Sequence, residues 1–549
     1  MTDSNKTLAI VIGKESVGKT ELISSLTGTH SKSSNFRGTT VACEIYENGN
    51  ISYIDTPGIL RSSETESLKI TLEHLEKNEN VLLLVSATHI DSDLSDILPL
   101  LKDKQGAIAL TFWDMATKSR SDATDTVERL KKALDMNIIP VDSRNLSEDD
   151  KKHIESALLN PAVFPSALPE EKAGWIIEPG KNIFDIFIVG QVLSLLLLFM
   201  PAWIAVQYAN AFADWLYDDV EALFAPMLKV INNWPQILSS LFGGTYGFVA
   251  MVPYLFLYAV PTVVVFAVIL SIYKTTGIVD RLTVALHPIM RHFGLAGRDL
   301  VRVIMGFGCN VPAVINTRAC SISSRGPAIC AVGFGAACSY QLPSTVAVFA
   351  AAKMKFLAVP YLIILGVTTL IYLRITTNAE SREKTNKLMI EGRDFLQVPK
   401  PAAVWREVWG VMSMFFFQAL PVFFIICAIA SMLEFTGILK AAGIIFGPVM
   451  KVFNLPADAS LTVILASIRK DGILLLTKGN VLAGLTSVQV MTAVYLAGVF
   501  FPCLVTLVSV VKEMKYKFAL KMVGKQALGA VVFSLAIAWG GIVFANVFG

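Results

Sequence analysis

The sequence has few charged residues for its length. Asp, Glu, Lys and Arg make up only 17% of its 549 residues, whereas a soluble globular domain has roughly a quarter. Hydrophobic residues make up 54%, and long apolar runs fill most of the second half of the chain. This composition excludes an ordinary soluble protein and predicts a polytopic membrane protein embedded in a lipid bilayer.

The chain also lacks a basic stripe, a cysteine framework and an export signal. The net charge is only +3 and no run of Lys and Arg stands apart from its counter-charges, so we expect no nucleic-acid partner. The seven cysteines are odd in number and lie mostly inside apolar segments, which indicates free thiols rather than disulfides or paired zinc ligands. Residues 1–7 are polar and the apolar run 8–12 is too short for a signal peptide, so we expect the head of the chain to stay in the cytoplasm.

Residues 1–145 alternate short β-branched runs with polar helical stretches, which predicts an α/β domain. The strand-like run 8–12 leads into G-x-x-x-x-G-K-T and then into a helical segment. In such a loop the backbone N–H groups wrap phosphates, Lys19 reaches the outer phosphates and Thr20 ligates Mg²⁺. The alternative is that the motif is a Gly-Lys turn that arose by chance, but the strand before it and the helix after it argue against this. The predicted nucleotide-binding residues of the loop are Gly13, Lys14, Glu15, Ser16, Val17, Gly18, Lys19 and Thr20.

A second motif follows the strand 51–54 at the spacing found in GTPases. Asp55 can hold Mg²⁺ through water, and the N–H of Gly58 can face a γ-phosphate. Between the two motifs lies a candidate first switch that contains Thr40, a further Mg²⁺ ligand. Lys19, Thr40 and Gly58 are therefore the candidate catalytic residues. The binding residues predicted here are Gly38, Thr39, Thr40, Asp55, Thr56, Pro57 and Gly58.

The base-reading site is expected after two further strands, 80–86 and 107–112. GTPases carry N-K-x-D there, whereas this chain has Thr111-Phe-Trp-Asp114. Asp114 keeps the carboxylate that accepts hydrogen bonds from guanine, but Thr111 replaces the amide, which weakens one base contact and one loop-tying hydrogen bond. Ser143, after the last strand 137–141, occupies the place of the final base-contacting loop. The pattern favours GTP as the nucleotide.

The rest of the chain is predicted to be an all-α polytopic domain, residues 183–549, after a short helical spacer, 146–182. Basic segments at 274–302, 374–406 and 512–525 indicate cytoplasmic loops. They all fit on that side only if two interrupted apolar stretches, 300–323 and 460–478, are re-entrant and the C-terminus lies outside. The crossings are then the apolar windows 184–209, 246–273, 326–351, 356–375, 408–433, 487–511 and 526–548.

The membrane domain contains an internal repeat. Residues 276–304 match residues 436–464 at a constant offset of 160, with nine of twenty-nine positions identical. The copies extend over about 276–353 and 436–512. Under the predicted topology one copy starts inside and the other outside, which is the inverted repeat of transporters that bind their cargo at the repeat interface.

Residues suited to metal ions fall in the interrupted segments. Glycine and proline free backbone carbonyls there, and a cation can satisfy them. Cys309 and Cys503, each near a proline, add thiols, and Asn310 adds a carbonyl; such soft donors suit Fe²⁺ better than Mg²⁺ or Ca²⁺. Asp471 and Glu434 are functional candidates as well, although Asp471 has the alternative role of neutralising its basic neighbours at 469 and 470. The remaining membrane cysteines Cys320, Cys330 and Cys427 are read as small buried apolar residues.

On these motifs the chain resembles the ferrous iron transport protein B family, FeoB, over nearly its whole length. The gate strings carry the resemblance most specifically: Gly306-Phe-Gly-Cys-Asn-Val-Pro-Ala313, Leu485-Thr-Ser-Val-Gln489 and Phe501-Pro-Cys-Leu-Val-Thr506. The resemblance implies a multi-pass protein of the cytoplasmic (inner) membrane, whose GTPase cycle is coupled to Fe²⁺ import. It further implies small cytoplasmic accessory proteins and a homo-oligomer as partners.

The chain departs from the family pattern at four places. Thr111 stands where the family has Asn, Ser16 stands at the Asn linked to potassium activation, the spacer is much shorter, and the acidic membrane motif reads Tyr273-Lys-Thr-Thr276. The departures leave alternatives open: a membrane-tethered regulatory GTPase that moves nothing itself, a carrier of Mn²⁺ or another divalent ion, and a nucleoside or organic-solute carrier, against which the thiol pair argues.

Overall fold

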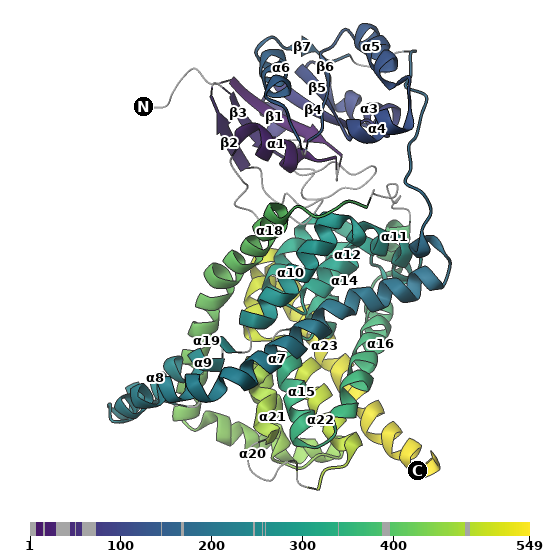
Figure 1. Ribbon diagram of the computed structural model, residues 1–549. Helices are drawn as coiled ribbons and strands as arrows, with labels where there is room; N and C mark the ends of the chain where they lie inside the picture. The colour runs from purple at the N-terminus through teal and green to yellow at the C-terminus, as the bar shows by residue number, and fades with distance from the viewer. Residues whose placement is uncertain are drawn as a thin grey trace.

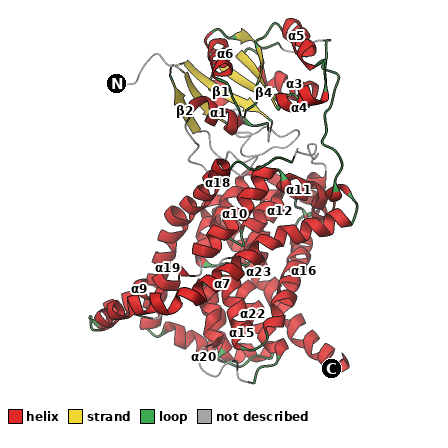
Figure 2. Cartoon of the chain, in the orientation of Figure 1, coloured by secondary structure: helices red, strands yellow, loops and turns green. Residues whose placement is uncertain are grey.

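A computed structural model shows a sheet-containing domain at one end of a helical body (Figures 1 and 2). The C-terminus lies at the end of the helical body opposite the sheet domain (Figure 1). The structure describes residues 7–14, 17–28, 44–49, 51–56, 73–143, 145–165, 170–244, 247–254, 256–257, 260–338, 340–386, 396–477, 482 and 484–548.

The predicted α/β domain is confirmed. Its main sheet has the order β2-β3-β1-β4-β5-β6, in which only the edge strand β2 is antiparallel, while β7 pairs antiparallel with β5. The inner strands are buried along nearly their whole length, as expected of Val-, Ile- and Leu-rich strands with helices on both faces. The strands are β1 (Thr7–Gly13), β2 (Glu44–Asn48), β3 (Ile51–Asp55), β4 (Asn80–Ser86), β5 (Gln105–Thr111), β6 (Ile138–Pro140) and β7 (Ala162–Val163).

The helices of this domain cover the sheet and extend beyond residue 145. Helix α6 lies in the segment expected to be a spacer and begins with a capping box at Ser147. Its residues Ile154, Ala157 and Leu158 are buried in the same cluster as strands β1 and β3. The packing of the domain therefore continues past the expected boundary. The helices are α1 (Lys19–Thr27), α3 (Ile90–Ile97), α4 (Trp113–Ser119), α5 (Ala123–Leu134) and α6 (Glu148–Leu159).

The helical body contains the long apolar segments. It comprises α7 (Val189–Asn232), α8 (Gln236–Gly243), α9 (Phe248–Tyr254), α10 (Val260–Thr276), α11 (Ile278–Met290), α12 (Gly297–Met305), α13 (Asn310–Asn316), α14 (Ile322–Gly335), α15 (Gln341–Ala351), α16 (Ala358–Thr376), α17 (Ala379–Asn386), α18 (Pro401–Met414), α19 (Leu420–Phe435), α20 (Ile438–Met450), α21 (Ala459–Ile468), α22 (Ser487–Val499) and α23 (Leu504–Phe548).

Fewer helices than expected are long enough to cross a bilayer. Within the described residues three qualify, Lys355–Thr376, Pro401–Phe435 and Ser487–Val543, or four if the pair α10 and α11, bent by 86°, counts as one span. The expected crossing 326–351 is divided into α14 and α15, each shorter than the roughly 20 residues that a span needs. A hydropathy window averages over such breaks, and this is why the sequence predicted seven crossings.

The two related segments have the same local structure. Helices α11 and α20 begin and end at residues 160 apart, and each follows a glycine with positive φ, Gly277 or Gly437. Further along, Cys309 and Arg469 are both extended residues that separate two short helices. The two segments therefore share a succession of helix, break and helix, whereas the internal repeat and its inversion across a membrane remain predictions.

The three basic segments meet on the side of the body that faces the sheet domain. Arg374 donates to the carbonyl of His292 at 3.0 Å, and Lys525 donates to that of Thr376 at 3.1 Å. Arg406 contacts Glu21 of the sheet domain at 3.0 Å. Loops that the charge pattern predicts on one side of a membrane thus lie together, as the proposed topology requires.

Candidate functional site

The phosphate loop holds Lys19 in a buried position. The Lys19 ammonium donates to the carbonyls of Gly13 at 3.0 Å and Lys14 at 2.6 Å. Gly18 has a φ of +89°, and a Cβ there would lie 3.3 Å from the hydroxyl oxygen of Ser143, so the position favours glycine. The amine is therefore folded over a tight loop at the start of α1. Glu15, Ser16 and the side chain of Thr20 lie outside the described residues.

Asp55 lies beside the phosphate loop because strands β1 and β3 are parallel and in register. Asp55 pairs with Val11 in the ladder and is only 1% exposed. The hydroxyl of Thr56 donates to the carbonyl of Val11 at 2.6 Å, so this side chain ties the strands together. Asp55 is thus a buried carboxylate at the end of β3, next to the strand that leads into the phosphate loop. The predicted residues Gly38, Thr39, Thr40, Pro57 and Gly58 lie outside the described residues.

Lys14 has a different role from Lys19. Its ammonium lies 2.9 Å from Asp93 and 2.7 Å from Asp96, both on α3. Burial lowers the pKa of Lys14, but the charge of Asp93 and the hydrogen bonds to both carboxylates outweigh it, so the pKa is raised. The Lys14 side chain therefore fastens the phosphate loop to α3 and stays charged at neutral pH.

The base-reading end shows how threonine replaces the usual amide. Thr111 is 1% exposed, and its hydroxyl donates to the carbonyl of Val85 at 3.3 Å. It thus ties β5 to β4 and points into the sheet. Asp114, in the first turn of α4, is more than one-third exposed and lies 3.6 Å from Lys118. The Ser25 hydroxyl donates to the carbonyl of Ser143 at 2.9 Å, so the loop that contains Ser143 lies against α1.

The end of the expected helical spacer, residues 170–182, is not helical, and part of it docks beside this site. The carboxylate of Asp91 accepts the backbone N–H groups of Ala173 and Gly174, each at 2.8 Å. The Trp175 indole donates to the carbonyl of Ala87 at 2.9 Å, and Arg120 lies 5.4 Å from its ring centre. The chain that leads to the helical body is therefore fixed to the loop after β4. In the sequence, the only sign of this docking is that Trp175, a large aromatic residue, stands in a polar stretch.

Cysteines from three separate breaks line one pocket in the helical body. Cys309 and Cys503, the predicted pair, are joined there by Cys338, which the sequence analysis did not single out. Asn310, the predicted carbonyl donor, also lines the pocket. The thiol of Cys503 is 2.9 Å from the hydroxyl of Thr506. The structure thus brings all three predicted metal-path residues together.

Charged side chains from the second repeat form another wall of this pocket. Arg469 pairs with Asp471 through two contacts, and its guanidinium lies 4.5 Å from the centre of the Phe423 ring. It also donates to the thiol of Cys427 at 3.0 Å, so Cys427 is more than a small buried residue. Asp471 therefore neutralises Arg469, which was its alternative role, and Glu434 does not line the pocket.

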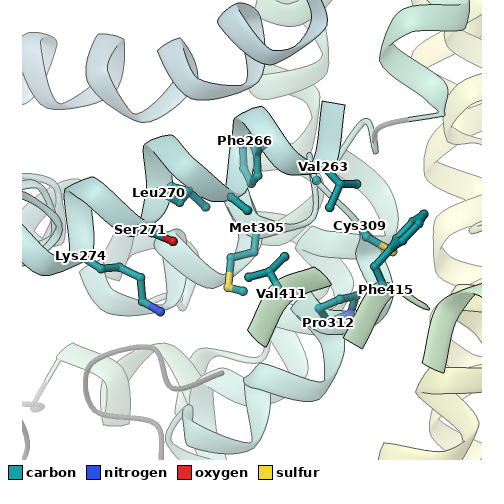
Figure 3. Close-up of a pocket in the computed structure, with 12 residues that line it drawn as sticks. Val263, Phe266, Leu270, Ser271, Lys274, Met305, Cys309, Pro312, Val411 and Phe415 are labelled. Carbon is teal, nitrogen blue, oxygen red and sulfur yellow. The ribbon is translucent and has the colours of Figure 1, made fainter. Parts of the chain in front are cut away.

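A second pocket extends from Cys309 and Phe415 between α10 and α18 (Figure 3). Its lining is apolar apart from Ser271 and Lys274 and includes the thioether of Met305. At its end the Lys274 ammonium forms an ion pair with the Glu407 carboxylate, and both are largely buried. Within the described residues, no group of three or more His, Cys, Asp or Glu is arranged to hold a metal ion. The two pockets share Cys309 and Phe415 in their lining.

Known protein families match both the sheet domain and the helical body of the chain. A family model described as Gate, nucleoside recognition, matches residues 256–353 and 416–517, and one described as 50S ribosome-binding GTPase matches residues 8–113. The Fe(2+) transporter FeoB of Helicobacter pylori strain J99 is 26% identical over 380 residues, which cover 61% of this chain and 58% of the relative. That of Campylobacter jejuni is 24% identical over 344 residues, covering 56% and 55%.

Two solved structures are also similar. The cytosolic domain of L. pneumophila FeoB is 18% identical, with 39% of this chain and 81% of that one covered and a TM-score of 0.24. The G domain of T. maritima FeoB is 26% identical, with 28% and 98% covered and a TM-score of 0.23.

A P-loop GTPase domain joined to a helical membrane body with gate segments defines the class of this protein. Together with the FeoB relatives, these matches support its membership of the FeoB family. The matched region spans little more than half the length of these relatives.

Proposed function

We propose that this protein imports Fe²⁺ across the cytoplasmic membrane along a cysteine-lined path that GTP controls. The observation that carries the proposal is the meeting of Cys309, Cys338 and Cys503 in one pocket. Thiols are soft donors and favour late transition metals over Mg²⁺ and Ca²⁺. The relatives named above are Fe²⁺ transporters, and this agrees with the donor set.

The nucleotide site fits GTP with Mg²⁺. The Lys19 ammonium would exchange its two loop carbonyls for phosphate oxygens, while Asp55 would hold the ion through water together with Thr20. A bound Mg²⁺ ion neutralises charge between the outer phosphates. Asp114, exposed at the base-reading end, would accept from guanine, and Thr111 would keep the strands tied without touching the base.

Helix α18 is suited to carry the nucleotide state to the path. Arg406 reaches the phosphate-loop helix α1, at 3.0 Å from Glu21 and 3.3 Å from Ser24. The next residue, Glu407, forms the ion pair with Lys274 that ends the second pocket. A shift of α1 on nucleotide binding would thus act on the Lys274–Glu407 pair through a single turn of one helix.

Uptake into liposomes that contain only this protein tests the proposal. We expect Fe²⁺ to accumulate faster than Mn²⁺ or Zn²⁺, and faster with GTP than without nucleotide. A regulatory GTPase that moves nothing itself would hydrolyse GTP in the same liposomes without metal uptake. Preference for Mn²⁺ would instead make the chain a carrier of that ion.

A further inference from the structure

Lys470 is a buried cation inside the cysteine-lined pocket. It is 4% exposed and lines the pocket together with the three cysteines. Its ammonium donates to the carbonyls of Gly498 at 2.5 Å and Phe501 at 2.6 Å. The mechanism proposed above gives this residue no role.

The two carbonyls are available because the chain breaks between α22 and α23. In a continuous helix the carbonyl of Gly498 would accept from the N–H of residue 502, but that residue is Pro502, which has none. Phe501 lies between the end of α22 at Val499 and the start of α23 at Leu504. Freed carbonyls at membrane depth need a partner, and a cation is a suitable one.

The equivalent position of the first repeat is neutral. Asn310 aligns with Lys470 at the offset of 160 and lines the same pocket. Its Oδ1 atom is buried and has no hydrogen-bond partner within the part of the chain that the structure describes. On the side of the first repeat, the Asn310 Oδ1 atom is therefore an acceptor that is not used. On the side of the second repeat, the Lys470 ammonium already occupies the carbonyls of Gly498 and Phe501.

We propose that Lys470 is a tethered cation that competes with the transported metal ion for the carbonyls of Gly498 and Phe501. A divalent ion that reaches Cys503 meets a like charge in a desolvated pocket, which disfavours its binding. Displacement of the ammonium would free the two carbonyl oxygens that the Lys470 side chain now occupies. Such competition keeps the site weak enough to release its cargo, as conduction requires. The inference rests on the proposed Fe²⁺ path.

Metal binding to the purified full-length chain in detergent tests this role. Anaerobic titration with Fe²⁺ is followed by calorimetry and by the unfolding temperature, for the wild type and for Lys470→Met, which keeps length but not charge. We expect the variant to bind Fe²⁺ at least about tenfold more tightly, because a like charge is removed. Without metal it should unfold at a lower temperature, because two buried carbonyls lose their donor, and Fe²⁺ should raise that temperature more than in the wild type.

Two further variants keep the result decisive. Lys525→Met removes a lysine that also donates to a backbone carbonyl, that of Thr376, but lies outside the pocket, so its Fe²⁺ affinity should equal that of the wild type. Lys470→Gln covers the case in which methionine prevents folding, because an uncharged amide can still donate to the carbonyls. A cooperative thermal unfolding transition of the helical body identifies folded protein.

Unchanged or weaker Fe²⁺ binding in both Lys470 variants would overturn the inference and leave Lys470 as a cap on a broken helix. Failure of the proposed path looks different: the wild type would then bind no Fe²⁺, or would bind it equally well after Cys309→Ser and Cys503→Ser.

Discussion

Lys19 and Asp55 show how single side chains are prepared for nucleotide in the GTPase domain. Both are buried at the carboxyl edge of the sheet, and the Lys19 ammonium is satisfied by two carbonyls of its own loop. When nucleotide binds, phosphate oxygens would replace these carbonyls as acceptors for the Lys19 ammonium. The new acceptors are negatively charged, so their hydrogen bonds are stronger.

Replacing Lys19 by Ala should abolish GTP hydrolysis and weaken nucleotide binding about 100-fold or more, because the charge that reaches the outer phosphates is lost. Phosphate release and fluorescent-nucleotide titration measure the two effects. Lys14→Ala is the matched control, since that amine faces Asp93 and Asp96, and it should retain more nucleotide affinity than Lys19→Ala. Wild-type hydrolysis by Lys19→Ala would remove the GTPase assignment.

Thr111→Asn should widen the preference for GTP over ATP. The Thr111 hydroxyl is committed to the carbonyl of Val85, so threonine offers no amide toward the base loop. Asparagine would restore that group, and we expect the GTP to ATP affinity ratio to rise about tenfold, the worth of roughly one hydrogen bond. Competition binding with both nucleotides measures the ratio. A ratio that stays constant would mean that Thr111 does not face the base-reading loop.

Cys309→Ser and Cys503→Ser should each slow Fe²⁺ uptake about tenfold and shift preference away from thiophilic ions, because a hydroxyl is a harder and poorer ligand. Cys320→Ser is the control, because this buried thiol does not line the pocket. Uptake of Fe²⁺, Mn²⁺ and Zn²⁺ in liposomes gives the metal order. GTP hydrolysis without metal should survive all three changes, which separates a role in the path from misfolding.

If the double variant Cys309→Ser with Cys503→Ser transported at the wild-type rate and in the wild-type metal order, the breaks would be structural hinges only. Cys427 is unsuitable as a neutral control, because its thiol accepts a hydrogen bond from Arg469.

Among the elements, helix α18 touches both halves of the molecule. Its residues Arg406 and Glu407 are adjacent in sequence, yet one contacts α1 of the sheet domain and the other pairs with Lys274 on α10. Successive residues of a helix point about 100° apart, so one turn can serve two partners. Helix α18 therefore connects α1 with the end of the second pocket through two adjacent residues.

Arg406→Glu should reduce the stimulation of Fe²⁺ uptake by GTP about fivefold, because it places like charges opposite each other at α1. Exchanging the charges in Glu21→Arg with Arg406→Glu should restore part of it. Arg382→Glu, on α17, is the control, since its guanidinium donates to the carbonyl of Arg374 rather than to the sheet domain. Uptake with and without GTP is compared in the same liposomes. Equal stimulation in all variants would argue against α18 as the connection.

At the scale of the whole molecule, the basic segments gather near the sheet domain and the C-terminus lies at the opposite end (Figure 1). This arrangement agrees with a topology in which the GTPase domain and the basic loops share the cytoplasm. Among the described residues, fewer helices are long enough to cross a bilayer than the apolar windows suggested, because some windows are divided between short helices.

Labelling with a membrane-impermeant maleimide in whole cells and in inverted vesicles tests this topology. Tyr516→Cys, which is 65% exposed between the basic residues of α23, should react only in inverted vesicles. Asp218→Cys on α7 and a cysteine added after Gly549 should react in whole cells, because both lie outside in the predicted topology. The unmodified chain is the control for native thiols. A C-terminus that reacts only in inverted vesicles would contradict the inverted repeat.

Features that depend on short, fixed spacings could be predicted from the order of the residues. The strand, loop and helix around Lys19 follow from residues that are neighbours in the chain, as do the tight turn at Gly18 and the break at Cys309. The repeat also predicted matching helices at an offset of 160, and α11 and α20 have matching ends. Local backbone geometry is set by nearby residues, so such features can be derived without a tertiary structure.

Contacts between side chains far apart in the chain could not be predicted, because they depend on how the helices pack. Cys338 joins Cys309 and Cys503, Arg469 reaches Cys427, and Lys274 finds Glu407 across more than one hundred positions. Hydropathy marks these segments as apolar but does not say which helix packs on which, because in a bilayer contacts depend on the shape of the packed surfaces rather than on hydrophobicity. The same holds for α6, whose burial against the sheet comes from its apolar face and not from its sequence position.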